Sequence, residues 1–103
     1  MTDNQFRLTA ANAEAPPVVV ATGEIDLANV EEFGAVLARA VADSSAVTVD
    51  LSAVTYCDSA ALRELFSVAA TAKLTLLVPA QGPISTLLSI SGLDKVATVT
   101  VAD

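Results

Sequence analysis

Apolar and polar residues follow two different periods along the chain, one typical of strands and one typical of helices. Residues 5–10 alternate between apolar and polar and predict an edge strand. Residues 18–22, 47–51 and 74–78 are short and almost continuously apolar, which predicts buried strands. Residues 96–101 alternate Val and Thr and predict the last strand. The strand pattern therefore extends over the whole chain.

Three segments between these strands have the spacing of amphipathic helices. They span residues 27–42, residues 58–72 and a segment that opens at Gly82-Pro83. Proline suits the first helical turn, and Gly92 followed by Leu93 predicts a left-handed C-terminal cap. The expected apolar stripes are Leu27, Val30, Phe33, Leu37, Ala40 and Val41 in the first helix, Leu62, Leu65, Phe66, Ala69 and Ala72 in the second, and Ile84, Leu87 and Leu88 in the third.

The start of the first helix can be placed in two ways. Asn29 and Glu32 have the spacing of a capping box, whereas Asp26 offers an earlier start. With either start the element order is β-β-α-β-α-β-α-β. This order predicts an α/β fold with a mixed, mostly parallel sheet of four to five strands, joined by right-handed crossovers. At 103 residues, without repeats or linkers, residues 1–103 are expected to form a single domain.

The charge balance narrows the classes of partner. The chain has 12 acidic and 5 basic residues and a net charge of −7, which disfavours nucleic acid and anionic membranes and suits docking to a more basic protein. No apolar run reaches the roughly 18 residues that a membrane span needs. The polar residues 1–5 do not form a signal peptide, so we expect a cytoplasmic protein.

The reactive side chains are few. A single cysteine, Cys57, allows no internal disulfide, and the chain has no histidine. We therefore expect no metal site with N/S ligands, no cofactor and no histidine-activated nucleophile. Cys57 is expected to be buried, although an exposed redox sensor is the alternative. Glu31 and Glu32 are adjacent on a helix and point in different directions, which predicts a solvated face rather than paired catalytic carboxylates.

The pair Asp58-Ser59 stands where the apolar strand that starts at residue 47 gives way, through a short loop containing Tyr56, to the second helix. A helix N-terminus presents free backbone N–H groups and favours negative charge, so a phosphate on Ser59 would be accommodated there. The simpler reading is that Asp58 caps the helix and Ser59 only occupies the next position. The dipeptide alone leaves both readings open.

Four motifs, in order along nearly the whole chain, resemble the STAS domains of bacterial anti-sigma factor antagonists. They are Gly23-Glu24-Ile25-Asp26, Val49-Asp50-Leu51-Ser52, Asp58-Ser59 followed by Leu62, and Gly92-Leu93-Asp94. The resemblance implies a STAS fold and a non-enzymatic regulator of transcription in a stress-response pathway. It implies that the unphosphorylated form binds an anti-sigma factor, commonly a serine kinase, and so releases a sigma factor.

In the same family the serine after the Asp is phosphorylated, which implies that a kinase switches the protein off at Ser59 and a phosphatase restores it. The protein is expected to be a monomer or weak dimer that does not insert into membranes. The expected partner-binding residues are Asp26, Asp58, Ser59, Ala60, Ala61 and Arg63.

Two departures from the family pattern leave other functions open. The family usually has Ser or Thr and then Gly after the phosphorylated serine, and here these positions are Ala60 and Ala61. The connection after this helix, residues 69–73, is also short and lacks the usual arginines. Small STAS proteins also serve as accessory subunits of ABC-type transporters, binding the ATPase subunit without a phosphoswitch, and this is the alternative. An enzyme with Ser59 as nucleophile is disfavoured because the chain lacks histidine.

Overall fold

The computed structural model describes residues 5–12, 14–42 and 44–102 as one α/β domain. The strands are β1 (Phe6–Thr9), β2 (Val18–Ile25), β3 (Ala46–Cys57), β4 (Lys73–Pro79) and β5 (Thr98–Ala102). The helices are α1 (Val30–Val41), α2 (Ser59–Thr71), α3 (Pro83–Ser91) and the short 3-10 helix η1 (Leu93–Lys95). The predicted element order is confirmed.

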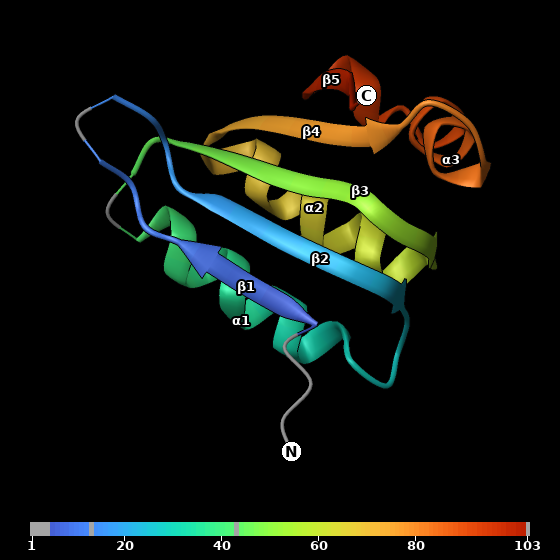
Figure 1. Ribbon diagram of the computed structural model, residues 1–103, viewed down its shortest axis with the longest axis horizontal. Coiled ribbons are helices and arrows are strands. Elements are labelled where there is room, and N and C mark those ends of the chain that lie inside the picture. Colours follow the sequence, from blue (N-terminus) through green and yellow to red (C-terminus); the bar gives the residue numbers. More distant parts are fainter. Residues whose placement is uncertain (1–4, 13, 43, 103) are drawn as a thin grey trace.

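The strands form one sheet in the order β1-β2-β3-β4-β5, which is also their order in the chain. β1 pairs antiparallel with β2, and the other neighbours are parallel. Helices α1 and α2 lie along one face of the sheet, and α3 lies at the far end of β4 (Figure 1). The mixed, mostly parallel sheet predicted from the sequence is therefore confirmed.

The core lies between the helices and one face of the sheet. Val19, Val49 and Leu76 are neighbours across β2, β3 and β4, and all three are 0% exposed. Phe33 of α1 is also fully buried, and its ring centroid lies 5.2 Å from that of Phe6 on β1. Among the described residues no polar side chain is buried, so apolar contacts alone hold the layers together.

The opposite face of the sheet carries no helix layer, and we call it the open face. The row of neighbours Thr9, Val18, Thr48, Thr75 and Thr98 crosses all five strands on this side. These side chains are half-buried or exposed. The next residue along β2, β3 and β4 is Val19, Val49 and Leu76, and these three are buried on the helix side. This alternation along each strand is the period-2 pattern of a sheet covered on one face.

Two strands are longer than the hydrophobic pattern predicts. The sequence places the end of β2 at residue 22, but β2 continues through Gly23 to Ile25. Gly23 has φ +74 and lies between two register shifts, at each of which β3 has one residue more than β2. β2 therefore continues beside bulges in β3 instead of stopping. The sequence also ends β3 at residue 51, whereas the strand runs on to Cys57 beside the extended β2. The predicted loop before Asp58 is therefore wrong.

The first helix begins at the later of the two starts that the sequence left open, three residues after the beginning of the predicted range at residue 27. α1 begins at Val30, and residues 26–29 form a turn closed by the N–H groups of Asn29 and Val30 on the carbonyl of Asp26, at 3.0 and 2.8 Å. Leu27 is consequently outside the helix and 78% exposed, so its place on the apolar stripe is wrong. Asn29 occupies the N-cap position but makes no side-chain capping bond, so the predicted capping box is also wrong.

The second and third helices match the predicted boundaries closely. Asp58 precedes α2 as its N-cap, Pro83 is the first residue of α3, and Gly92 ends α3 in the left-handed conformation with φ +85. Leu93, which follows this cap, is fully buried as predicted. Phe66 is the exception, because the buried face of α2 is formed by Ala61, Leu65 and Val68, which leaves Phe66 36% exposed.

Candidate functional site

The ends of β2 and β3 bring the two predicted aspartates together. Ile25 and Cys57 are the last paired residues of these parallel strands, and the N–H of Asp58 donates to the carbonyl of Ile25 at 3.1 Å. Asp26 and Asp58 each come directly after this pair. Since neighbouring strands are about 4.8 Å apart, both acidic residues leave the sheet at one place.

Asp58 is the N-cap of α2. Its backbone is extended, with φ −96 and ψ −174, and its Oδ1 accepts from the N–H groups of Ala60 at 3.0 Å and Ala61 at 3.2 Å. A helix leaves its first N–H groups without partners in the helix, and the carboxylate satisfies two of them. The capping role that the sequence left open is therefore what the structure shows for Asp58.

Ser59 is the first residue of α2 and is exposed, so its hydroxyl is open to solvent. Arg63 follows one turn later and is exposed as well. Ala60 is half-buried, and Ala61 is 0% exposed within the core. The side chain of Ala61 faces inward, so it is not available to a partner, and its methyl does not obstruct docking where the family usually has glycine.

The loop that carries Asp26 is held by two amide side chains that sequence analysis did not single out as site residues. The Nε2 of Gln5 donates to the carbonyls of Thr22 at 2.9 Å and Glu24 at 2.6 Å. The Nδ2 of Asn29 donates to the same Glu24 carbonyl at 2.9 Å, and its Oδ1 accepts from the N–H of Asp26 at 2.9 Å. The sequence assigned Asn29 to a capping box and so missed its bonds to this loop. No residue near Gln5 in the chain indicates that the Gln5 side chain supports the loop.

Exposed apolar side chains flank the acidic pair. Leu27 is 78% exposed beside Asp26, and Tyr56, which pairs with Glu24 two residues before Asp58, is 47% exposed. We define the β2–β3 end surface as Asp26, Leu27, Tyr56, Asp58 and Ser59. It combines negative charge, an exposed serine and exposed apolar area.

Comparison with known proteins identifies the family. A family model described as "Mlab, STAS domain" matches residues 8–101. The chain belongs to the STAS domain family. A comparison with curated proteins gives no match.

Solved structures share the fold of this STAS domain. An anti-sigma factor antagonist from Mycobacterium paratuberculosis superposes with a TM-score of 0.80 and 24% identity, over 96% of this chain and 88% of that one. The anti-sigma factor antagonist SpoIIAA in its unphosphorylated form gives 0.72 and 20%, over 92% and 87%. The phosphorylated form of the Bacillus cell fate determinant SpoIIAA gives 0.66 and 19%, over 92% and 90%.

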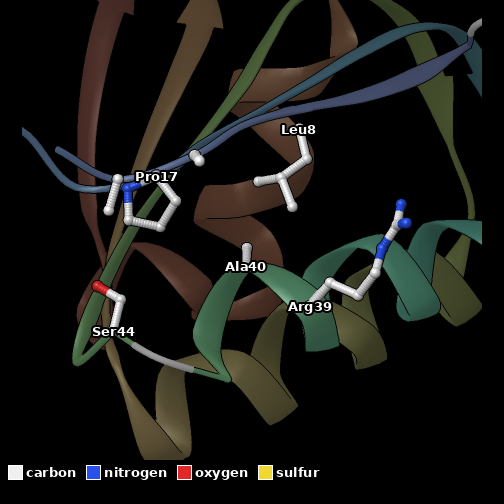
Figure 2. A pocket seen from close by; sticks show the side chains of 7 residues that line it. Leu8, Pro17, Arg39, Ala40 and Ser44 are labelled. Atoms are coloured by element: carbon white, nitrogen blue, oxygen red, sulfur yellow. The ribbon is translucent and has the colours of Figure 1, made fainter.

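Two hollows in the STAS domain are lined by residues other than those of the β2–β3 end surface. One, of about 110 Å³, is at the start of β2, where Leu8, Pro17 and Ala40 form its apolar walls (Figure 2). Arg39 is the charged residue of its lining, and Figure 2 shows the guanidinium turned away from Pro17 and Ser44. Because Asp26 follows the eight residues of β2, it lies about 26 Å along the strand from this hollow.

The second hollow, of about 280 Å³, lies between the end of β3 and the start of α3 and is lined by residues such as Val54, Pro83 and Ile84. Neither hollow is lined by a group of acid–base residues. Within residues 5–12, 14–42 and 44–102 no three Cys, Asp or Glu side chains converge as a metal site requires. In the same part of the chain no helix is long and apolar enough to cross a membrane.

Cys57 is 2% exposed at the end of β3, as the sequence predicts for a structural thiol. Burial, and secondly the charge of Asp58, raise the pKa of the thiol. We expect Cys57 to react with a thiol-specific disulfide reagent at pH 8 at least about 100-fold more slowly than the unfolded chain, because both burial and the raised pKa suppress the reactive thiolate. A comparable rate in native buffer and in denaturant would instead support the redox-sensor reading.

The same raised pKa makes stability depend on pH. The thiol of the unfolded chain ionises first, near pH 8.5. The stabilising contribution of the neutral Cys57 is therefore complete below that pH and is lost as the pH rises through the folded-state pKa. Urea unfolding at increasing pH should show this loss, and Cys57→Ala should remove that part of the pH dependence.

The capping role of Asp58 can be tested separately from binding. Asp58→Ala should lower the free energy of unfolding by about 1 kcal/mol, because the N–H groups of Ala60 and Ala61 lose their acceptor. Asp58→Asn should retain most of the stability, since asparagine caps helices about as well as aspartate. Urea unfolding of both variants measures this difference, and equal stability of the two would contradict the capping role.

Proposed function

We propose that this STAS domain is an anti-sigma factor antagonist that binds its anti-sigma factor through the β2–β3 end surface and is switched off by phosphorylation of Ser59. The family match and the fold shared with anti-sigma factor antagonists support this role. The observation that carries it is the exposed Ser59 hydroxyl at the first position of α2, on a turn that Asp58 holds rigidly.

The surface suits a basic and partly apolar partner. Asp26 and Asp58 supply negative charge on a chain of net charge −7, which attracts a positively charged surface and speeds association. Leu27 and Tyr56 supply the apolar area that gains free energy when water is removed. Arg63, one turn along α2, is exposed beside this surface and completes the set of residues offered to the partner.

Phosphorylation converts this surface from binding to non-binding. The γ-phosphoryl group of ATP passes to the Oγ of Ser59, the hydroxyl proton is released and ADP leaves. The phosphate carries about −1.5 to −2 charges at pH 7 and is larger than the hydroxyl it replaces. Within the free domain the helix N-terminus stabilises the negative charge of the phosphate. In a complex the phosphate would lose its hydration against the apolar partner surface that covers Leu27, which costs free energy.

The partner implied by this chemistry is an anti-sigma factor with serine kinase activity, which docks on the unmodified surface and also transfers the phosphate. Binding frees the sigma factor, and a serine phosphatase returns the domain to its binding form. The domain itself acts as a binding protein and not as an enzyme, in keeping with a chain that offers no histidine to activate Ser59.

A paired affinity capture from the native cell extract tests the proposal, with Ser59→Ala and Ser59→Glu as baits and mass spectrometry as the readout. The Ala bait should retain an ATP-binding anti-sigma factor and the Glu bait should lose it. Retention of the same partner by both baits would contradict the phosphoswitch. If that partner were a transporter ATPase subunit, the constitutive accessory role would replace the proposed one.

A further inference from the structure

The last strand, β5, leaves one edge of the sheet unpaired. It bonds to β4 on one side, and on the other side no strand of the described part of the chain adjoins it (Figure 1). An edge strand presents a row of N–H and C=O groups that can pair with another strand. β5 is thus a ready template for extension of the sheet.

This edge lacks the devices that usually block such pairing. Residues 96–102 contain no charged residue, no proline and no glycine, and are mostly Val and Thr. Proteins generally protect edges with charges, prolines or very short strands. The other edge strand, β1, has such protection, since it carries the exposed charge of Arg7.

The side chains of β5 are incompletely covered on the helix side of the sheet. Val99 neighbours Leu76, and Val101 neighbours Val78, so both valines point to the face that α1 and α2 cover. Val99 is half-buried against the core, but Val101 is 52% exposed. The helices therefore do not fully cover the β5 edge of the sheet, and the side chains of Val99 and Val101 are partly or largely exposed there.

We propose that two copies of this chain associate through β5, pairing antiparallel about a two-fold axis at Thr100. This register places Val99 of each copy opposite Val101 of the other, on the same face, so the four valines form one cluster. Thr100 meets Thr100 of the second copy on the open face. Antiparallel partners of these residue types stabilise strand pairs, and the interface is self-complementary, as two-fold symmetry requires.

The geometry favours a second copy over other occupants of the edge. A pair formed by β5 with itself closes after two molecules, whereas β5 pairing with β1 of another copy would bring Arg7 into an uncharged strand and would not close. A five-residue strand buries much less than the roughly 1,200 Å² of a stable interface, so the dimer should be weak and dependent on concentration. β4 separates β5 from the β2–β3 end surface, so this inference is independent of the proposed function.

Sedimentation analysis of the full chain over a concentration series tests the proposal. The wild type should dimerise with a dissociation constant in the range of about 10 μM to 1 mM. Val101→Lys should weaken dimerisation at least tenfold, because it places two charges in the valine cluster. Val96→Lys is the matched control, since Val96 is 54% exposed but precedes β5, and it should leave the dimer intact. A wild type that stays monomeric up to about 1 mM overturns the proposal.

Disulfide trapping tests the register without relying on a destabilising change. Under mild oxidation Thr100→Cys should form an intermolecular disulfide in high yield, because the two-fold axis brings its Cα within about 5.5 Å of its counterpart. Thr98→Cys should trap poorly, since position 98 lies opposite position 102 in this register. Cys57 is buried and does not compete. Equal trapping at positions 98 and 100, or none at 100, overturns the proposed pairing.

Discussion

Phosphorylation of Ser59 is expected to lower the affinity for the proposed anti-sigma factor partner by at least about 100-fold, or about 2.7 kcal/mol. The same modification should change the free energy of unfolding by less than about 1 kcal/mol. The helix N-terminus favours negative charge by about 0.3–1 kcal/mol, and repulsion from Asp58 opposes that gain. Calorimetric titration of the phosphorylated and unmodified domains, together with urea unfolding, measures both quantities.

A control for total charge separates a local effect from general repulsion. Ser89→Glu adds a negative charge at an exposed serine of α3, outside the β2–β3 end surface, and should leave the affinity within about threefold of wild type at physiological salt. A similar loss of affinity for Ser89→Glu and for phosphorylated Ser59 would show that net charge, not the position of Ser59, controls binding. Unchanged affinity on phosphorylation would contradict the switch altogether.

Phe33→Ala is expected to lower the free energy of unfolding by about 3–5 kcal/mol, the largest loss that we predict for a single residue. Phe33 is 0% exposed between α1 and the sheet, and its ring packs on Phe6 at 5.2 Å between centroids. In a chain with 4% aromatic residues, few side chains could fill the resulting cavity. Thermal unfolding should show a fall in Tm on the order of 15–30 °C.

Phe66→Ala is the matched comparison, because Phe66 is 36% exposed on α2 and should cost less than half as much. A double-mutant cycle with Phe6→Leu and Phe33→Leu should give a coupling of about 0.5–1.5 kcal/mol, as expected for an aromatic pair. Additive losses in that cycle would show that the two rings contribute only buried area.

The sequence correctly predicted the helix ends that are fixed by residues close to them in the chain. Asp58 marks the start of α2 because its carboxylate satisfies N–H groups only two and three residues away. Gly92 marks the end of α3 because the left-handed conformation at φ +85 suits glycine. The order of elements along the chain followed from the alternation of apolar strands and helices. In the two helix caps the interacting residues are close in the chain.

The misplaced boundaries depend on contacts between distant segments. Residues 52–56 of β3 read as a loop because Ser52, Thr55 and Tyr56 break the apolar run. They remain extended because β2 runs beside them, although the pairing shifts register twice at bulges in β3 that no hydrophobic pattern reveals. The apolar stripe shows only roughly which side of α2 faces the sheet. Phe66 lies next to Leu65 at the border of that side, and the sequence therefore assigned it to the core.

The sequence pointed to three residues of the candidate site but not to Leu27, Tyr56 or the side chains that support the site. Asp58 and Ser59 could be located from the helix start, and Asp26 from its motif. The amides of Gln5 and Asn29 that hold the Asp26 loop join positions 24 residues apart, so only the folded chain brings them together. The exposure of Leu27 likewise depends on where α1 begins, which the sequence left ambiguous.

The backbone bond from Asp58 to Ile25 has a consequence for how such domains diverge. It joins the residue before Ser59 to the residue before Asp26 through backbone atoms, without using the side chain of Leu27 or Tyr56. Leu27 and Tyr56 can therefore be exchanged for other residues without moving the hydroxyl. Related domains in one cell could acquire separate binding preferences through these two positions and keep the same geometry at Ser59, which would insulate their partners from one another.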